Sequence, residues 1–344
     1  MSDQTADGDS GRAPDRPPPP AERLRREPLP WQRPKASEDD ADAARRVRAI
    51  LDSPSYRQAD ADVDFLRSGE TRGVRLQIDY YKPELALENH GVEHTIVVFG
   101  STRIHEPAAA LRQVELLREQ CAAQPQDASL QRRLAVARRV LDKSPYYEVA
   151  RDLGRLIACG GTGPQDDRVM LMTGGGPGIM EAANRGAFDA GAKSIGLNIS
   201  LPHEQFPNPY ITPDLCFRFH YFALRKLHFV MRARALVAFP GGYGTFDELF
   251  ETLTLIQTRK IRPVPVILVG RSYWRQAVDI DFLVDEGVIE PEDRELFWYA
   301  ETAQEIWDGI LRWHQANGTP LYSANGLRPP RGRVPPYAED EDIL

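Results

Sequence analysis

Two glycine-rich stretches of this 344-residue chain have the composition of anion-binding turns. The first, Thr173–Asn184, is TGGGPGIMEAAN, and the second, Pro240–Glu248, is PGGYGTFDE. Each follows an apolar run and precedes a segment with helical periodicity. Glycine lets the backbone approach a ligand closely, and the unpaired N–H groups of a helix's first turn attract anions. Both stretches are therefore candidate sites for a phosphate group.

The first stretch does not match the common nucleotide-binding signatures. Counted from Gly174, Ile179 occupies the final glycine position of G-x-G-x-x-G, and the chain contains no G-x-x-x-x-G-K-[ST]. The second absence argues against ATP hydrolysis of the P-loop kind. Because a glycine-rich connection is often only a tight turn, this stretch alone supports a binding function and a structural one about equally.

The second stretch offers more ligand-binding groups. Gly241, Gly242 and Gly244 can expose backbone N–H groups. The hydroxyl of Thr245 adds a further donor, and the whole set suits a phosphate monoester. However, Thr245-x-x-Glu248 also has the spacing of a capping box. In that motif the glutamate would bond back to the threonine N–H and have no catalytic role, and spacing alone favours it.

A basic pair, Arg225-Lys226, lies on the predicted helix before the second stretch. Adjacent basic residues usually form a solvated helix face. A guanidinium near the ligand edge of a sheet can instead hold a phosphate or a ribose-bearing anion with two hydrogen bonds. The basic pair and the two glycine-rich stretches together are stronger evidence for a site than any one of them.

The apolar runs in front of these stretches predict a parallel sheet. Five short runs are separated by segments with helical periodicity, and they span residues 94–99, 169–172, 194–199, 235–239 and 264–269. Strands that alternate with helices in this way indicate an α/β fold, a doubly wound parallel sheet covered on both faces. Ligands of such sheets bind beyond the carboxyl ends of the strands, where both glycine-rich stretches would lie.

The rest of the chain is predicted to decorate this one domain, which spans 91–326. Residues 1–40 and 327–344 combine proline with charge and few large apolar residues, so we expect both tails to be disordered, the second being acidic. Helical patterns predict accessory helices over 41–90. Two further helical patterns predict an inserted hairpin over 105–145, with a role in packing or oligomerisation.

Composition excludes several classes of protein. Lys+Arg 43 against Asp+Glu 50 gives a net charge of −7, without the basic field that nucleic-acid binding requires. The longest apolar runs fall far short of the roughly 20 residues that span a bilayer. The N-terminal stretch lacks the apolar core of a signal peptide. Three cysteines without zinc-site spacing suit reduced thiols. We therefore expect a cytoplasmic protein without a membrane span or a metal.

Three motifs closely resemble those of the LONELY GUY (LOG) family, long labelled as possible lysine decarboxylases: Gly174–Met180, Arg225-Lys226 and Pro240–Glu248. Phe99–Arg103, FGSTR, is similar to the family's first turn, and the resemblance covers roughly 94–314 outside the helical insertion. It implies a Rossmann-like fold, usually in a homodimer. It also implies hydrolysis of the N-glycosidic bond of a nucleoside 5′-monophosphate, such as AMP or a cytokinin nucleotide, to a free base and ribose 5-phosphate, with no cofactor.

The resemblance also implies roles for individual residues. It makes Arg225 and Glu248 catalytic, and it implies a surrounding set that binds the nucleotide and its phosphate: Gly100, Ser101, Gly174, Gly175, Gly176, Glu181, Lys226, Gly241, Gly242, Gly244 and Thr245. Glu248 would stabilise an oxocarbenium-like state or activate water. Its place near a helix N-terminus would favour its ionised form. Arg225 would hold the substrate, oppose the phosphate charge or help the departing base.

Short cytokinin-activating members have Met-His before x-Arg-Lys, whereas residues 219–226 of this chain are FHYFALRK. This form resembles longer bacterial members, as do Glu181 and Asn184. Two other functions stay open. A pyridoxal-phosphate decarboxylase needs a lysine for its Schiff base, and of the six lysines only Lys226 lies in a candidate site segment. A nucleotide-binding or carrier protein of the same fold would hydrolyse nothing.

Overall fold

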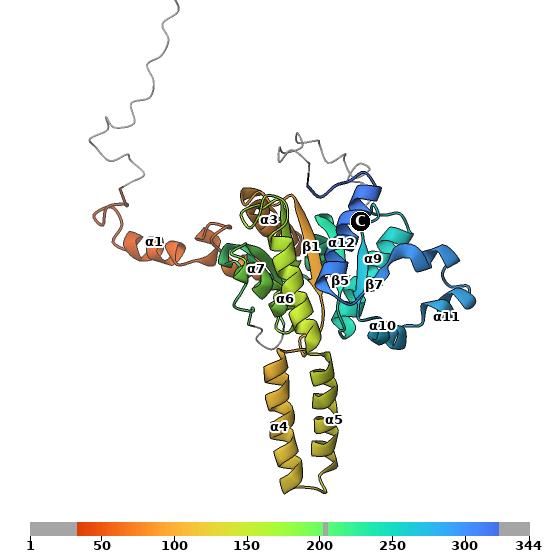
Figure 1. Ribbon diagram of the computed structural model, residues 1–344. Helices are drawn as coiled ribbons and strands as arrows, with labels where there is room; N and C mark the ends of the chain where they lie inside the picture. The colour runs from red at the N-terminus through yellow and green to blue at the C-terminus, as the bar shows by residue number, and fades with distance from the viewer. Residues whose placement is uncertain (1–32, 202–205, 323–344) are drawn as a thin grey trace, which may run out of the picture. The chain divides into compact units, whose positions relative to one another are not determined.

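The computed structural model describes residues 33–201 and 206–322 (Figure 1). The chain forms two compact units, 1–71 and 72–344. The first unit contains α1 (Ala43–Leu51), a 3-10 turn (Pro54–Tyr56) and α2 (Val63–Arg67). Of the predicted disordered tails, residues 33–40 adopt bends and turns, and the remainder lies outside the described residues.

A single sheet of seven parallel strands organises the second unit. The strands are β1 (His94–Phe99), β2 (Val169–Thr173), β3 (Ser194–Ile199), β4 (Cys216–Phe219), β5 (Ala233–Ala238), β6 (Val266–Val269) and β7 (Trp298–Ala300). Their spatial order is β4-β3-β2-β1-β5-β6-β7, and all neighbouring pairs are parallel. The predicted Rossmann-like α/β fold with a doubly wound parallel sheet is confirmed.

Helices cover both faces of this sheet, which is why its central strands are mostly apolar. One face packs against α6 (Pro145–Ala158), α7 (Ile179–Asp189) and α12 (Ala303–Ala316). The other packs against α3 (Arg72–Asn89), α8 (Phe222–Met231), α9 (Tyr243–Gln257) and α10 (Arg271–Ala277). Alternate residues of a strand point to opposite faces. In β1, Ile96 and Val98 therefore enter the first core, whereas Val97 and Phe99 enter the second.

The two edge strands, β4 and β7, were not predicted. Strand β4 alternates, with Arg218 exposed between buried Phe217 and Phe219, and β7 has only three residues. Neither forms the continuous apolar run that is typical of a strand buried on both faces. The remaining short elements of this unit are α11 (Ile280–Asp285) and two 3-10 segments, Pro213–Leu215 and Pro291–Leu296.

Two long helices form a hairpin within the range predicted as an insertion. They are α4 (Pro107–Ala123) and α5 (Ala128–Lys143), and in Figure 1 they extend away from the sheet. The Asp127 side chain caps α5 by accepting hydrogen bonds from two backbone N–H groups. The hairpin has a small core of its own, formed by Val114, Leu117, Leu130 and Ala137.

The predicted group of accessory helices, 41–90, is divided between the two units. Helix α3 belongs to the unit that contains the sheet, and its Leu87 is buried in the core of that unit. The Asp79 carboxylate on α3 also accepts hydrogen bonds from the backbone N–H groups of His220 and Tyr221, immediately before α8. Helix α3 is thus an integral part of the α/β unit.

The strand order places the ligand edge between β1 and β5. From β1 the chain proceeds through β2, β3 and β4 in one direction, and it then returns to β5, β6 and β7 on the other side. At such a switch point the connections leave in opposite directions and open a crevice at the carboxyl ends of the strands. Residues 100–101 follow β1 and residues 240–242 follow β5, so two of the predicted turns lie at the carboxyl ends of the two strands at this switch point.

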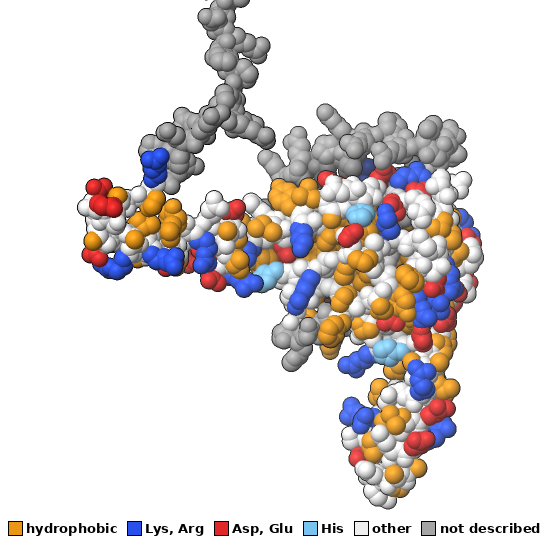
Figure 2. Space-filling model, turned by 90° about the vertical axis from the view of Figure 1, so that its left-hand side faces the viewer, with side chains coloured by type: hydrophobic (Ala, Val, Ile, Leu, Met, Phe, Trp, Pro, Cys, Tyr) orange, Lys and Arg blue, Asp and Glu red, His pale blue; other side chains and the backbone are white. Residues whose placement is uncertain are grey.

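Charges of both signs are interspersed on the molecular face shown in Figure 2, where Lys and Arg side chains alternate with Asp, Glu and hydrophobic ones. This mixture agrees with the modest net charge of −7. In residues 33–201 and 206–322, no helix has the length and apolar character needed to cross a bilayer.

Candidate active site

The second glycine-rich stretch forms a tight turn that leads directly into α9. Helix α9 begins at Tyr243 with Gly242 as its N-cap. A side chain at Gly241 would collide with Thr245 Oγ1, and the Tyr273 hydroxyl donates a hydrogen bond to the Gly241 carbonyl. By contrast, the space beside Gly242 and Gly244 is open. Contacts within the protein therefore fix the turn. The N–H groups of Tyr243 and Gly244, at the start of the helix, have no acceptor among the described residues and can bind an anion.

The capping-box interpretation of Thr245 and Glu248 is wrong. Because α9 begins at Tyr243, Thr245 is the third residue of the helix and not its N-cap, and no side-chain cap bond is present. The Thr245 N–H donates to the Gly242 carbonyl at 2.9 Å. The Glu248 carboxylate is consequently available for another partner.

That partner is Arg225, so the two predicted catalytic residues lie together. Nη2 of Arg225 on α8 is 3.4 Å from Oε1 of Glu248 on α9, and the two side chains are only 14% and 5% exposed. The guanidinium also lies over the rings of Phe222 and Phe229, 4.7 and 5.6 Å from their centroids. The Arg225 Nε is buried without a hydrogen-bond partner among the described residues. The pair thus keeps an unused donor in a desolvated site.

Burial controls the ionisation of Glu248. It raises the pKa of the Glu248 carboxyl to about 7, against the opposing effect of Arg225 and Lys226. We expected the helix N-terminus to favour the ionised form, but Glu248 is the sixth residue of α9. The helix-end effect fades within the first turn, so desolvation prevails. Near neutral pH the carboxyl can therefore either accept or hold a proton.

The turn after β1 joins the two glycine-rich stretches. The Ser101 N–H donates to the Pro240 carbonyl at 3.0 Å, and the Ser101 carbonyl accepts from the Ile179 N–H at 3.1 Å. The Ser101 hydroxyl accepts from the Arg103 N–H at 3.1 Å. Gly100 and Ser101 thus connect the start of α7 with the turn that leads into α9, and the three predicted turns share one edge of the sheet.

The first glycine-rich stretch is held by its own hydrogen bonds. Gly175 has a positive φ of 72°, a conformation that favours glycine. A side chain there would collide with Asn198. The Gly175 N–H donates to Thr173 Oγ1 at 3.0 Å, so this N–H group is used internally. The neighbouring N–H groups of Gly174 and Gly176 have no acceptor among the described residues.

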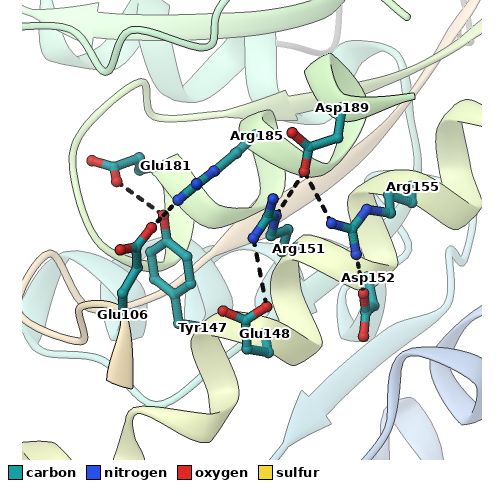
Figure 3. A network of polar contacts seen from close by, with 9 residues as sticks. All are labelled: Glu106, Tyr147, Glu148, Arg151, Asp152, Arg155, Glu181, Arg185 and Asp189. Atoms are coloured by element: carbon teal, nitrogen blue, oxygen red, sulfur yellow. Dashed lines mark hydrogen bonds and ion pairs between the residues drawn. The ribbon is translucent and has the colours of Figure 1, made fainter. Parts of the chain in front are cut away.

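Glu181 lies in a different polar cluster from the Arg225–Glu248 pair. Its carboxylate accepts a 3.0 Å hydrogen bond from the hydroxyl of Tyr147 on α6, and burial, reinforced by Glu181, raises the pKa of that hydroxyl. Figure 3 shows this contact beside the ion pair that Arg185 makes with Glu106. No described contact joins Glu181 to Arg225 or Glu248.

Comparison with known proteins identifies the family. A family model described as "Possible lysine decarboxylase" matches residues 180–310. A probable cytokinin riboside 5′-monophosphate phosphoribohydrolase of Oryza sativa subsp. japonica is 30% identical over 181 residues, which cover 49% of this chain and 77% of the relative. The chain belongs to the LOG family. A LOG relative from Arabidopsis thaliana, a cytokinin riboside 5′-monophosphate phosphoribohydrolase, is 31% identical over 169 residues, or 48% of this chain and 74% of the relative.

One solved structure in the comparison is the Moco carrier protein from Chlamydomonas reinhardtii. It is 17% identical, with a TM-score of 0.38, and the match covers 65% of this chain and 99% of that protein.

The decarboxylase label of the LOG family does not suit Lys226. Its ammonium forms ion pairs with Asp247 at 2.9 Å and Glu251 at 3.0 Å. Burial lowers the pKa of Lys226, but the bonds to these two carboxylates outweigh it and raise the pKa above its ordinary value. Schiff-base chemistry needs a lysine that readily loses its proton. Lys226 instead binds α8 to α9, next to the Arg225–Glu248 pair.

Some residues of this candidate site were not predicted from the sequence. Asp247 and Glu251, which hold Lys226, are four positions apart on α9, and such residues share a helix face. That spacing could have revealed them. Tyr273, which fixes the Gly241 carbonyl, is far away in sequence and gives no local signal. Within the described part of the chain, no group of His, Cys, Asp and Glu residues could hold a metal ion.

Proposed function

We propose that this protein hydrolyses the N-glycosidic bond of a nucleoside 5′-monophosphate, either AMP or a cytokinin riboside 5′-monophosphate. The products would be the free base and ribose 5-phosphate. The observation that carries the proposal is the buried pair of Arg225 and Glu248, 3.4 Å apart, beside the open first turn of α9. The names of the two plant relatives support this reaction.

The first turn of α9 would hold the substrate's phosphate. The N–H groups of Tyr243 and Gly244 and the hydroxyl of Thr245 offer donors at the positive end of a helix. Such binding requires no net positive charge, because the donors are local dipoles. Lys226, paired with Asp247 and Glu251, would fix the position of α8 against α9 and add positive charge to this edge of the sheet.

Cleavage of a ribosyl bond passes through an oxocarbenium-like state at the anomeric carbon. The ionised Glu248 carboxylate would stabilise that charge or take a proton from the attacking water. Water would supply the oxygen that bonds to the anomeric carbon, and the base would leave with the electrons of the broken C–N bond and gain a proton. Arg225 would orient the substrate next to Glu248, with its free Nε–H as an additional donor.

The working form of the protein would be a cytoplasmic homodimer or a larger homo-oligomer, with no metal and no cofactor. This part of the proposal rests on the family resemblance. Light scattering of the purified protein during size-exclusion chromatography tests it directly, since a monomer mass at the concentration of the activity assay would contradict it.

The decisive assay is incubation of the purified full chain with AMP, followed by chromatography of the products. We expect adenine and ribose 5-phosphate in equal amounts, with the rate unchanged by a chelator. If calorimetry detects AMP binding but AMP stays intact, the chain is a nucleotide-binding or carrier protein and the proposed reaction is wrong. A panel of isopentenyl-AMP, AMP, GMP, CMP and UMP then defines the preferred base.

A further inference from the structure

A closed network of buried polar side chains lies beneath the first glycine-rich turn. Its members are Thr173 at the end of β2, Asn184 on α7, Ser194 at the start of β3 and Asn208 in the segment after β3. Thr173, Asn184 and Ser194 are fully buried, and Asn208 is only 6% exposed. Polar groups are costly to bury unless they are paired, so four such residues at one place need an explanation.

Asn184 is the centre of this network. Its Oδ1 accepts hydrogen bonds from the Thr173 hydroxyl at 2.7 Å and from Asn208 Nδ2 at 3.0 Å. Its Nδ2 donates to Ser194 Oγ at 2.9 Å and to the Ile195 carbonyl at 3.4 Å. These four bonds satisfy both lone pairs of the amide oxygen and both hydrogens of the amide nitrogen. The orientation of Asn184 is thereby fixed, and with it the positions of Thr173 and Asn208.

The outer members of the network hold the backbone of the glycine-rich turn at three atoms. Thr173 Oγ1 accepts from the Gly175 N–H at 3.0 Å. The Asn208 N–H donates to the Gly175 carbonyl at 2.9 Å, and Asn208 Nδ2 donates to the Gly176 carbonyl at 3.1 Å. The two peptide groups on either side of Gly175, which has a positive φ, are thus both fixed by hydrogen bonds to Thr173 and Asn208. The N–H groups of Gly174 and Gly176 have no acceptor among the described residues, so they remain available as donors.

We propose that Thr173, Asn184 and Asn208 are positioning residues that hold this turn in its anion-binding form. The inference rests on the proposed nucleotide chemistry, which it deepens. None of the three needs to touch the substrate. They act through the turn, because donors held in place by packing and hydrogen bonds lose little order when a ligand binds, and small displacements of a binding group are costly.

Thr173→Val tests this proposal most sharply, because valine keeps the shape of threonine and removes only the hydroxyl. The chain offers a matched control in Thr95→Val. Thr95 lies in β1, is equally buried, and has a hydroxyl with no partner among the described residues. Thr173→Ser restores the hydroxyl and should rescue the first variant. Asn208→Ala, in an irregular segment, is a second variant that avoids changing a central strand.

Two measurements separate positioning from general stability. Hydrogen exchange should accelerate about tenfold in peptides that cover residues 174–178 of Thr173→Val and Asn208→Ala, but not in Thr95→Val. The KM for AMP should rise by about tenfold or more in the same two variants, with kcat changed less than about threefold, because the turn binds substrate and transition state alike. Thr173→Ser should return both quantities to within about twofold of the original protein.

The outcomes distinguish this inference from the proposed function. Unchanged exchange in Thr173→Val, or the same change in Thr95→Val, would overturn the idea that the network holds the turn. Accelerated exchange with an unaltered KM would overturn its role in substrate binding. If the original protein leaves every nucleotide intact, the proposed function fails, and exchange together with the affinity for ribose 5-phosphate in these variants still decides whether the network shapes an anion site.

Discussion

At the scale of single residues, the catalytic proposal depends on Glu248. Replacing it by glutamine keeps the size of the side chain and an acceptor for Arg225, but removes the charge that would stabilise an oxocarbenium-like state. We expect Glu248→Gln to lower kcat for AMP by at least about 100-fold. AMP affinity, measured by calorimetry, should change less than about threefold.

The control for this substitution is a second buried glutamate that pairs with an arginine. Glu84 on α3 forms an ion pair with Arg232, the residue that follows α8, and neither of the two belongs to a glycine-rich turn. Glu84→Gln should lower the stability of the protein by the amount that follows from weakening a buried ion pair, while leaving kcat close to its original value. If both variants lose activity in proportion to their folded fraction, Glu248 has a structural role only.

The pKa of Glu248, raised by burial to about 7, predicts how activity depends on pH. The proposed reaction needs the ionised carboxylate, so kcat/KM for AMP should rise as the pH increases from 5.5 towards about 8, with an apparent midpoint near 7. A pH–rate profile of the free enzyme tests this. A flat profile across this range would show that Glu248 is ionised throughout or is not required.

The same raised pKa makes a prediction about stability. The folded state binds this proton more tightly than the unfolded state, whose glutamate has the ordinary value of 4.5. The contribution of Glu248 to stability is therefore fully present below about 4.5 and is lost as the pH rises towards about 7. Glutamine does not titrate, so the Tm of Glu248→Gln relative to the original protein should increase between pH 5 and pH 8. A constant difference in Tm would contradict the raised pKa.

At the scale of helices and strands, the sequence pattern predicted the elements whose residues are continuously apolar or have a regular periodicity. The five predicted strands were all found, because a strand buried on both faces carries an uninterrupted apolar run. The edge strands β4 and β7 were not predicted, because β4 alternates between buried and exposed residues and β7 has only three residues. The capping-box error has a related cause. The start of α9 is set by the turn at Gly241 and Gly242, which moves Thr245 into the helix.

The site shows the same division between local and long-range signals. Motifs predicted Arg225 and Glu248, and the fold brings them together from two helices. The buried network around Asn184 was not predicted, although Thr173 and Asn184 lie in the first glycine-rich stretch. Asn208 completes the network from a segment whose sequence has no periodicity. A hydrogen-bonded cluster assembled from four segments has no spacing in the sequence that could reveal it.

The α4–α5 hairpin offers a prediction for a whole structural element. Leu117 is buried in the hairpin's own small core, which is separate from the two cores of the sheet. Leu117→Ala should destabilise the hairpin by about 3 kcal/mol. Hydrogen exchange should therefore accelerate in residues 107–143, while kcat/KM for AMP stays within about twofold. A large loss of activity without global unfolding would mean that the hairpin contributes to the active form.

At the scale of the whole molecule, net charge is a poor guide to this ligand. A chain with a net charge of −7 would repel a nucleotide at long range, and Figure 2 shows charges of both signs mixed over one face. The proposed site would overcome this repulsion with short-range groups, namely helix N–H dipoles and two cations paired with carboxylates. Such interactions act within a Debye length, so the total charge matters less than the arrangement at one edge of the sheet.

The division into two units leads to a prediction about the minimal enzyme. Every residue assigned to the site lies in the unit 72–344, and so do the seven strands and both cores of the sheet. A shortened chain must keep helix α3, because the Asp79 carboxylate accepts hydrogen bonds from the backbone N–H groups just before α8, the helix that carries Arg225. A chain of residues 72–344 should therefore fold cooperatively and retain kcat and KM for AMP within about twofold. Removal of residues 72–90 as well should abolish activity, because it exposes the core around Leu87. If 72–344 folds, with an unaltered near-ultraviolet dichroism spectrum, yet turns over no AMP, then the first unit supplies part of the active site.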